Sequence, residues 1–140
     1  MNESTQVKSA ALLLRVTLGV MYIAHSVVLK AFIYGLQGTA GYFESIGLPG
    51  VLAYVVFTAE LIGGVLLLAG WFTRAVSLAL IPILIGATWV HSGNGWVFSN
   101  QGGGWEYPIF LIIASIVLAL LAAPRREGAS ASVPAPAMRA

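Results

Sequence analysis

Hydrophobic and polar positions divide the chain into four long apolar stretches, separated by shorter segments that are richer in glycine and polar residues. The apolar stretches cover residues 10–32, 51–69, 75–91 and 106–123. A bilayer core of about 30 Å needs about 20 helical residues to cross it, whereas strands are usually about 3–10 residues long. The sequence also lacks the alternating pattern of a membrane β-barrel. The pattern therefore predicts four membrane-spanning helices.

Composition points to the same class of protein. Only 9% of the 140 residues are charged and 59% are hydrophobic, against about 25% charged residues in soluble proteins. Such a chain cannot cover a soluble fold with polar side chains, which excludes a cytosolic enzyme, a disordered regulator and a nucleic-acid binder. Without cysteine, the chain carries no disulfide, thiolate metal site or iron–sulfur cluster. We expect an all-α integral membrane protein, a four-helix transmembrane bundle surrounded by lipid.

Basic residues are spread unequally between the two sides of this predicted bundle. Six of the seven fall on the side that holds both termini and the connection between the second and third spans: Lys8, Arg15, Arg74, Arg125, Arg126 and Arg139. Only Lys30 falls on the other side. By the positive-inside rule, both termini are cytoplasmic. Residues 1–9 form a cytoplasmic N-terminus, and residues 124–140, rich in Ala, Ser and Pro, form a flexible cytoplasmic tail.

The ionisable residues inside the predicted spans give the main indication of function. A charged group at the centre of a membrane helix costs about 2.5–3.5 kcal/mol, so it usually faces a partner or a cavity. Glu60 lies near the middle of the second span, and Gly63 and Gly64 beside it allow another helix to approach closely. With the orientation above, five ionisable residues from all four spans are expected to converge in the outer half: His25, Lys30, Glu60, His91 and Glu106. Tyr22, Trp89, Asn94 and Trp105 can join them, since Tyr22, Ser26 and Lys30 share one helix face.

Each of these residues also has a purely structural interpretation. Lys30 can extend to the outer interface, Glu106 can stabilise a helix N-terminus, His91 can cap a helix, and Glu60 can hold helices together. The expected convergence of the five ionisable residues favours instead an outward-facing pocket that binds a ligand or transfers protons. The spacing Glu-x-x-His of helical di-metal sites is absent, and so are nucleotide-binding motifs. A carboxyl, an imidazole and aromatic rings suit a quinone or a phenolic head group.

The chain resembles the DoxX family of small four-helix bacterial membrane proteins from about Leu13 to Leu121. The segments that carry the resemblance are Arg15-x-x-x-Gly19, His25-x-x-x-x-Lys30, Gly47-Leu48-Pro49, Glu60-Leu61-Ile62-Gly63-Gly64, Gly70-Trp71-Phe72-Thr73-Arg74, His91 and Gly104-Trp105-Glu106-Tyr107-Pro108. Ser26 departs from the pattern, because the family more often has Gly after the histidine. The resemblance implies an inner-membrane protein linked to redox chemistry and quinone handling, without supplying a mechanism.

Three hypotheses follow from the residues and the resemblance together. The leading one is a membrane subunit of an oxidoreductase system that binds a quinone-like molecule and receives electrons from a partner subunit. In it Glu60 and His25 are the catalytic candidates, which handle protons or hydrogen bonds. Lys30 and His91 orient the head group, Glu106 and Trp105 close the mouth, and Tyr22 and Trp89 add contacts. The alternatives are a non-catalytic scaffold that docks a redox enzyme, and a small-solute or proton-linked transporter built by a homo-oligomer.

Overall fold

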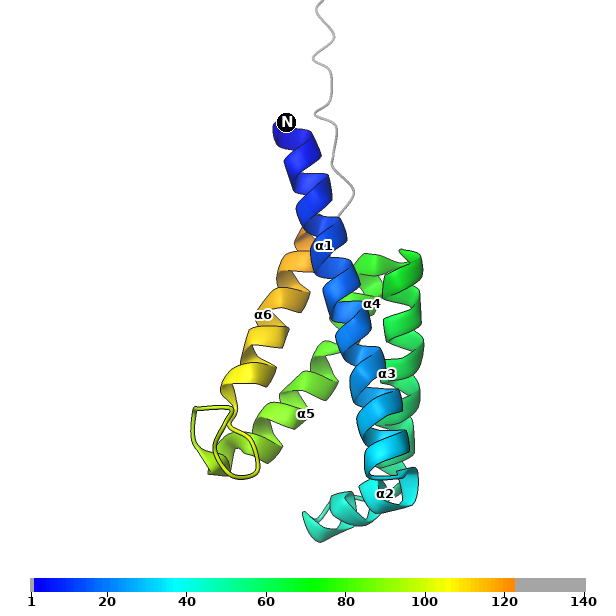
Figure 1. The fold of residues 1–140 in the computed structure, drawn as a ribbon, viewed down its shortest axis with the longest axis vertical. Coiled ribbons are helices and arrows are strands. Elements are labelled where there is room, and N and C mark those ends of the chain that lie inside the picture. The colour runs from blue at the N-terminus through cyan, green and yellow to red at the C-terminus, as the bar shows by residue number, and fades with distance from the viewer. Residues whose placement is uncertain (1, 123–140) are drawn as a thin grey trace, which may run out of the picture.

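The computed structural model describes residues 2–122, and within that range the chain is entirely helical, with no strand. Figure 1 shows the long first helix crossing the molecule between two groups of helices, with α3 and α4 on one side and α5 and α6 on the other. The elements are α1 (Glu3–Ile23), η1 (Ala24–Ile33), α2 (Leu36–Ser45), α3 (Val51–Ala69), α4 (Thr73–Ala79), α5 (Ile81–His91), η2 (Ser92–Asn94) and α6 (Glu106–Leu121).

The first span is one rod of two helical types. Asn2 starts α1 by accepting a hydrogen bond from the Thr5 backbone N–H, at 2.9 Å. From Ala24 the rod continues as the π-helix η1, in which backbone hydrogen bonds join residues five apart, as from Tyr34 N–H to the Leu29 carbonyl at 3.0 Å. π-helix usually occurs as single-turn bulges, frequently at functional sites, whereas η1 extends over ten residues. The wide turns of η1 hold Lys30 and His25, two of the predicted site residues.

The connection between residues 35 and 50 is more ordered than the sequence suggested. It contains the helix α2, which follows Gly35, a residue with a φ of 70° that glycine adopts easily. The Thr39 hydroxyl of α2 is buried and donates to the Gly35 carbonyl at 2.9 Å. The same hydroxyl also lies 3.3 Å from the Lys30 carbonyl oxygen, and this contact ties α2 to the end of the first rod.

The third predicted span, residues 75–91, is not one continuous helix. The chain turns sharply after α3 through Gly70 (φ 78°) and Phe72 (φ 51°), and then forms α4, which ends at Ala79. Pro82 stands in the first turn of α5, and because proline has no N–H it cannot continue the hydrogen-bond ladder of α4. The predicted third span therefore lies within one apolar stretch, Thr73–Asn94, which a turn at Leu80 just before Pro82 divides into α4 and α5.

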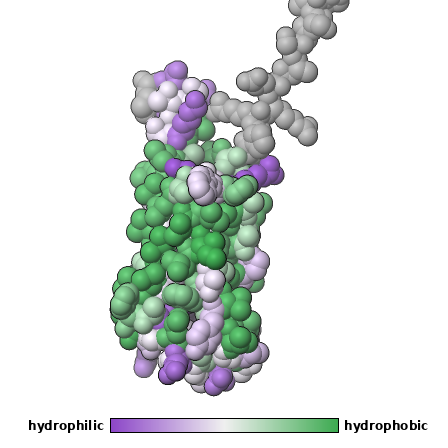
Figure 2. All heavy atoms as spheres, turned by 90° about the vertical axis from the view of Figure 1, so that its right-hand side faces the viewer, coloured by the Kyte–Doolittle hydropathy of each residue, from purple (hydrophilic) through white to green (hydrophobic). Residues whose placement is uncertain are grey.

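Lengths and exposed surfaces agree with a membrane helical bundle. Three stretches are long and apolar enough to cross a bilayer, Glu3–Ile33, Val51–Ala69 and Thr73–Asn94, and Glu106–Leu121 is a shorter apolar helix. In Figure 2 hydrophobic side chains cover the middle of the visible face, with hydrophilic ones gathered towards its two ends. We call the end with the Gly70–Arg74 turn the turn end, and the end with α2 and residues 95–105 the loop end.

Close packing of small residues holds α1 against α3. A Cβ atom at Gly64 would lie 2.9 Å from the Gly19 carbonyl oxygen, and one at Gly19 would lie 3.0 Å from the Gly64 carbonyl oxygen. The two backbones therefore touch, as in other membrane helix pairs with small residues at the contact. The core around this contact consists of Leu18, Tyr22, Leu67, Val76, Leu80, Leu84, Leu111, Ala114 and Leu118.

Candidate functional site

A buried ion pair joins the first rod to α3. The Lys30 ammonium donates to Glu60 Oε2 at 2.6 Å, and the two side chains are 16% and 8% exposed. It is the only ion pair formed within residues 2–122. Lys30 thus reaches inward to the middle of α3, in contrast to the alternative in which it extends to the interface. Burial of a charge without a partner costs a large free energy, so each residue lowers the cost of burying the other at this depth.

The geometry that allows this pair begins with the packing of α1 on α3. The Gly19–Gly64 contact brings the two helices close one turn away from Glu60. Along the rod, Tyr22 and Ser26 are buried and Lys30 is largely buried, so these three residues do share one inward face. Ser26 satisfies its own hydroxyl by donating to the Ile23 carbonyl at 3.1 Å.

His25 lies on a neighbouring face of η1 and meets α6. Its ring stacks on Tyr107, with centroids 6.2 Å apart and planes 24° from parallel. Nδ1 of His25 lies 3.0 Å from the Met21 carbonyl oxygen. A carbonyl can only accept a hydrogen bond, so Nδ1 is the donor in this contact, and Nε2 has no hydrogen-bond partner within the described part of the chain. The imidazole is therefore held in one orientation with one nitrogen available.

Tyr22 contributes a second hydroxyl near the centre of the bundle. Its side chain is 1% exposed and packs where α1 meets α6. The Tyr22 hydroxyl faces the Ser115 hydroxyl of α6, and both are buried without any other hydrogen-bond partner within the described part of the chain. Buried hydroxyls are normally paired, so these two groups are best regarded as partners of each other across the contact between α1 and α6.

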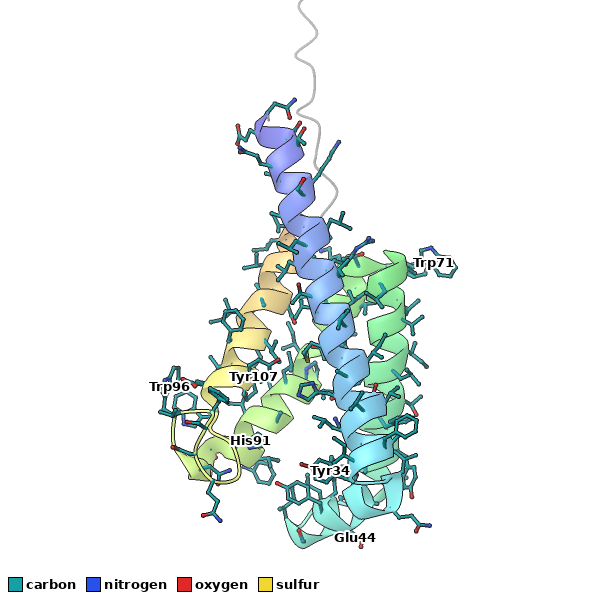
Figure 3. The ribbon with its side chains drawn as sticks, in the orientation of Figure 1. Tyr34, Glu44, Trp71, His91, Trp96 and Tyr107 are labelled. Atoms are coloured by element: carbon teal, nitrogen blue, oxygen red, sulfur yellow. The ribbon has the colours of Figure 1, made fainter. Side chains whose placement is uncertain are left out.

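The remaining predicted residues organise the loop of residues 95–105. The Glu106 carboxylate accepts from the Phe98 backbone N–H at 2.8 Å, and Nδ1 of His91 lies 3.0 Å from the Gly102 carbonyl oxygen. Trp105 packs edge-on against Trp96, with centroids 4.5 Å apart. Figure 3 shows His91 and Trp96 beside this loop. Trp89 is 59% exposed on α5.

The predicted residues therefore form two groups. Lys30 and Glu60 are in direct contact, with His25 and Tyr22 on the same rod as Lys30. His91, Trp105 and Glu106 bind the loop at the loop end instead of contacting the ion pair. Tyr107 lies next to Glu106 in sequence and stacks on His25, so α6 links the two groups.

Asn100 and Ser115 were not predicted from the sequence, whereas Asn94 was a candidate to join the ionisable residues. Asn94 and Asn100 fix the loop, Asn94 by donating to the Gly102 and Gly103 carbonyls and Asn100 by donating to the Asn94 carbonyl. Ser115 was hidden as a small polar residue in an apolar helix. Asparagines between glycines are a recognised sign of side chains that bond nearby backbone, whereas nothing in the sequence around Ser115 distinguishes it.

Comparison with known proteins supplies the family. The family model described as DoxX matches residues 10–93. The chain belongs to the DoxX family. A protein of Bacillus subtilis (strain 168) named "Putative oxidoreductase CatD" is 39% identical over 120 residues, which cover 86% of this chain and 83% of that protein. No solved structure matches the chain.

The DoxX match includes the ion pair and ends before the loop of residues 95–105. His25, Lys30, Glu60 and His91 lie within residues 10–93, whereas Glu106 lies beyond them. Membership of this family, together with apolar helices long enough to cross a bilayer, makes the chain a multi-pass membrane protein with an oxidoreductase-associated relative.

Proposed function

We propose that this DoxX-family chain is a membrane subunit of an oxidoreductase system and binds a quinone-like molecule beside the Lys30–Glu60 pair. The buried ion pair at 2.6 Å is the observation that carries the proposal, because membrane proteins retain charged groups at this depth mainly for function. The name of the Bacillus subtilis relative supports the oxidoreductase context. The loop end faces outward in this proposal, with both termini at the cytoplasmic side of a bacterial inner membrane.

The donor set fits a quinone head group. Quinone carbonyls accept hydrogen bonds, and the Lys30 ammonium is a donor that is 16% exposed while bound to Glu60. Quinol hydroxyls donate hydrogen bonds, and the free Nε2 of His25 accepts them. A bound quinone supplies two-electron redox chemistry, for which the electrons come from a partner subunit. The aromatic pair of His25 and Tyr107 offers flat faces for the ring.

Roles for the protein's own groups follow from their positions. Lys30 orients a carbonyl by donating a hydrogen bond, and Glu60 holds the ammonium in place and exchanges a proton with it or with the ligand. His25 takes or returns a proton at Nε2, while Met21 fixes its ring. His91, Trp105 and Glu106 shape the mouth through the loop that they bind.

Binding of a short-chain quinone to purified protein in lipid nanodiscs tests this proposal. Glu60→Gln should weaken binding about tenfold or more, as expected for loss of a charged group at a ligand site. Glu44→Gln is the matched control, because it makes the same change on an exposed residue of α2. Equal quinone affinity of the wild type and Glu60→Gln would show that the ion pair is not part of the ligand site.

A second candidate function is a scaffold that docks a redox enzyme. The loop supports it, because hydrogen bonds hold residues 95–105 in one shape while Trp96 and Phe98 stay 52% and 66% exposed. Exposed aromatic residues on a fixed framework are typical of protein contacts. Replacement of both by serine should then abolish recovery of a partner from native membranes and leave quinone binding unchanged. The opposite pattern of results would argue for the quinone site.

A further inference from the structure

The turn end of the molecule holds a second set of charged residues that the proposed function does not use. Arg15 of α1 extends to the C-terminal end of α3, where its guanidinium packs against Gly70. Its Nε atom is buried and has no hydrogen-bond partner within the described chain. Arg74 follows in the first turn of α4 and is exposed. Within residues 2–122 neither arginine has a carboxylate within ion-pair distance.

Helix electrostatics explain only one of these arginines. A cation at the C-terminus of a helix is stabilised by the free carbonyls and the helix dipole, which accounts for Arg15 beside the end of α3. The same dipole disfavours a cation in the first turn of a helix, which is where Arg74 stands. The helix that carries Arg74 therefore does not stabilise its charge, and the guanidinium is exposed and open to an anion.

A groove connects the two arginines to the lipid-facing surface. It has a volume of about 580 Å³ and is lined by Gly70, Phe72, Thr73, Arg74, Ala75, Leu78 and Ala122. Gly70 is also the residue against which Arg15 packs, so the groove has Arg74 in its lining and Arg15 directly behind another lining residue. Phe72 and Leu78 are 77% and 44% exposed and give the rest of the groove an apolar wall. Trp71 projects from the bundle beside it (Figure 3).

We propose that this groove binds one anionic phospholipid, with the phosphate between Arg15 and Arg74 and an acyl chain along Phe72 and Leu78. Arginine is suited to phosphate because its planar donors match the phosphate oxygens in pairs. Basic pockets between membrane helices bind anionic head groups in this way. A free phosphate ion would satisfy the arginines but would leave the apolar wall without a partner, so the geometry favours the lipid.

Lipid titration of the full chain by native mass spectrometry tests the site. The probes are phosphatidylglycerol and phosphatidylcholine with identical acyl chains. We expect phosphatidylglycerol to bind with higher affinity, and Arg74→Gln to reduce this preference about fivefold, the effect of one basic residue near an anionic surface. Lys8→Gln is the matched control, because Lys8 is an exposed basic residue of α1 outside the groove. Equal binding of the two lipids, or equal effects of the two variants, would overturn the proposal.

Two further arms identify the source of the phosphate and the place of binding. Inorganic phosphate at millimolar concentration should not displace phosphatidylglycerol, and displacement would show a phosphate site and refute a lipid site. In vesicles, phosphatidylglycerol brominated on its acyl chains should quench Trp71 more strongly than brominated phosphatidylcholine does. The Trp71 signal is the difference between wild type and Trp71→Phe. Equal quenching by the two lipids would contradict the proposed acyl-chain position even if Arg74→Gln failed to fold.

Discussion

The Lys30 ammonium nitrogen lies 2.6 Å from Glu60 Oε2, and this contact ties the π-helical end of the first rod to the middle of α3. Both side chains are largely withdrawn from the surface. Loss of one partner of such a pair costs more free energy than replacement of both, because it leaves a buried charge unpaired. The pair therefore links the stability of the bundle to its proposed ligand site.

Replacement of one member of the ion pair should lower the free energy of unfolding more than replacement of both. Lys30→Met leaves the Glu60 carboxylate buried alone, and we expect a loss of about 3–5 kcal/mol in the free energy of unfolding. Lys30→Met combined with Glu60→Leu replaces the pair by apolar groups and should recover most of that loss. Equilibrium unfolding in mixed detergent micelles measures all three proteins. A double variant less stable than Lys30→Met would show that the pair itself contributes net stability.

The contact between α1 and α3 should tolerate no added methyl group. Gly64→Ala would place its Cβ 2.9 Å from the Gly19 carbonyl oxygen, and backbone cannot move aside as a side chain can. We expect a loss of about 1–3 kcal/mol from overpacking and weaker quinone binding, since α3 carries Glu60. Gly86→Ala of α5 is the matched control, because nothing lies within 4 Å of the Cβ that it adds. Stability equal to that of Gly86→Ala would contradict the close helix contact.

The Glu106 carboxylate should govern the order of the loop. Glu106→Gln weakens its bond to the Phe98 N–H, and bonds to charged groups contribute about 1.5–3 kcal/mol where water is excluded. This residue is partly exposed, so we expect the lower part of that range. Hydrogen exchange of residues 95–105 should rise by about tenfold in Glu106→Gln. Unchanged exchange would mean that Asn94 and Asn100 hold the loop without Glu106.

The stack of Tyr107 on His25 predicts a graded effect on ligand affinity. Tyr107→Phe keeps the ring and should bind a short-chain quinone about as well as the wild type, because the stack involves only the ring faces. Tyr107→Leu removes the aromatic face and should weaken quinone binding about fivefold, in line with the roughly 0.5–1.5 kcal/mol of aromatic pairs. Titration in nanodiscs compares the two variants. Equal quinone affinities of Tyr107→Phe and Tyr107→Leu would show that the aromatic face of α6 is not part of the quinone site.

Much of the helical framework could be predicted from hydrophobicity alone. The predicted second span, residues 51–69, matches α3 (Val51–Ala69) at both ends, because glycine or proline bounds an uninterrupted apolar run there. The predicted start of the fourth span at residue 106 coincides with the start of α6. The π-helical geometry of η1 has no signal in the local sequence, since it depends on how the rod packs on α3. Pro82 did signal the break before α5, and the apolar pattern around it concealed that signal.

The site was less predictable than the fold. Helix periodicity placed Tyr22, Ser26 and Lys30 on one face, and all three lie inward. It could not pair Lys30 with Glu60, because the pairing depends on the Gly19–Gly64 contact between helices distant in sequence. The bonds of His91 and Glu106 to loop backbone depend on a loop conformation that glycine-rich sequence leaves open.

The break between α4 and α5 divides the bundle into two mechanically different halves. At the turn end, α1, α3, α4 and α6 brace one another, whereas α5 rests mainly on α6. A change of backbone angle near Leu80 would swing α5 together with the His91–Gly102 contact while the Gly19–Gly64 contact stayed in place. Bending at Leu80 and Pro82 would therefore move the loop end of α5 while the helices that carry Lys30 and Glu60 kept their packing.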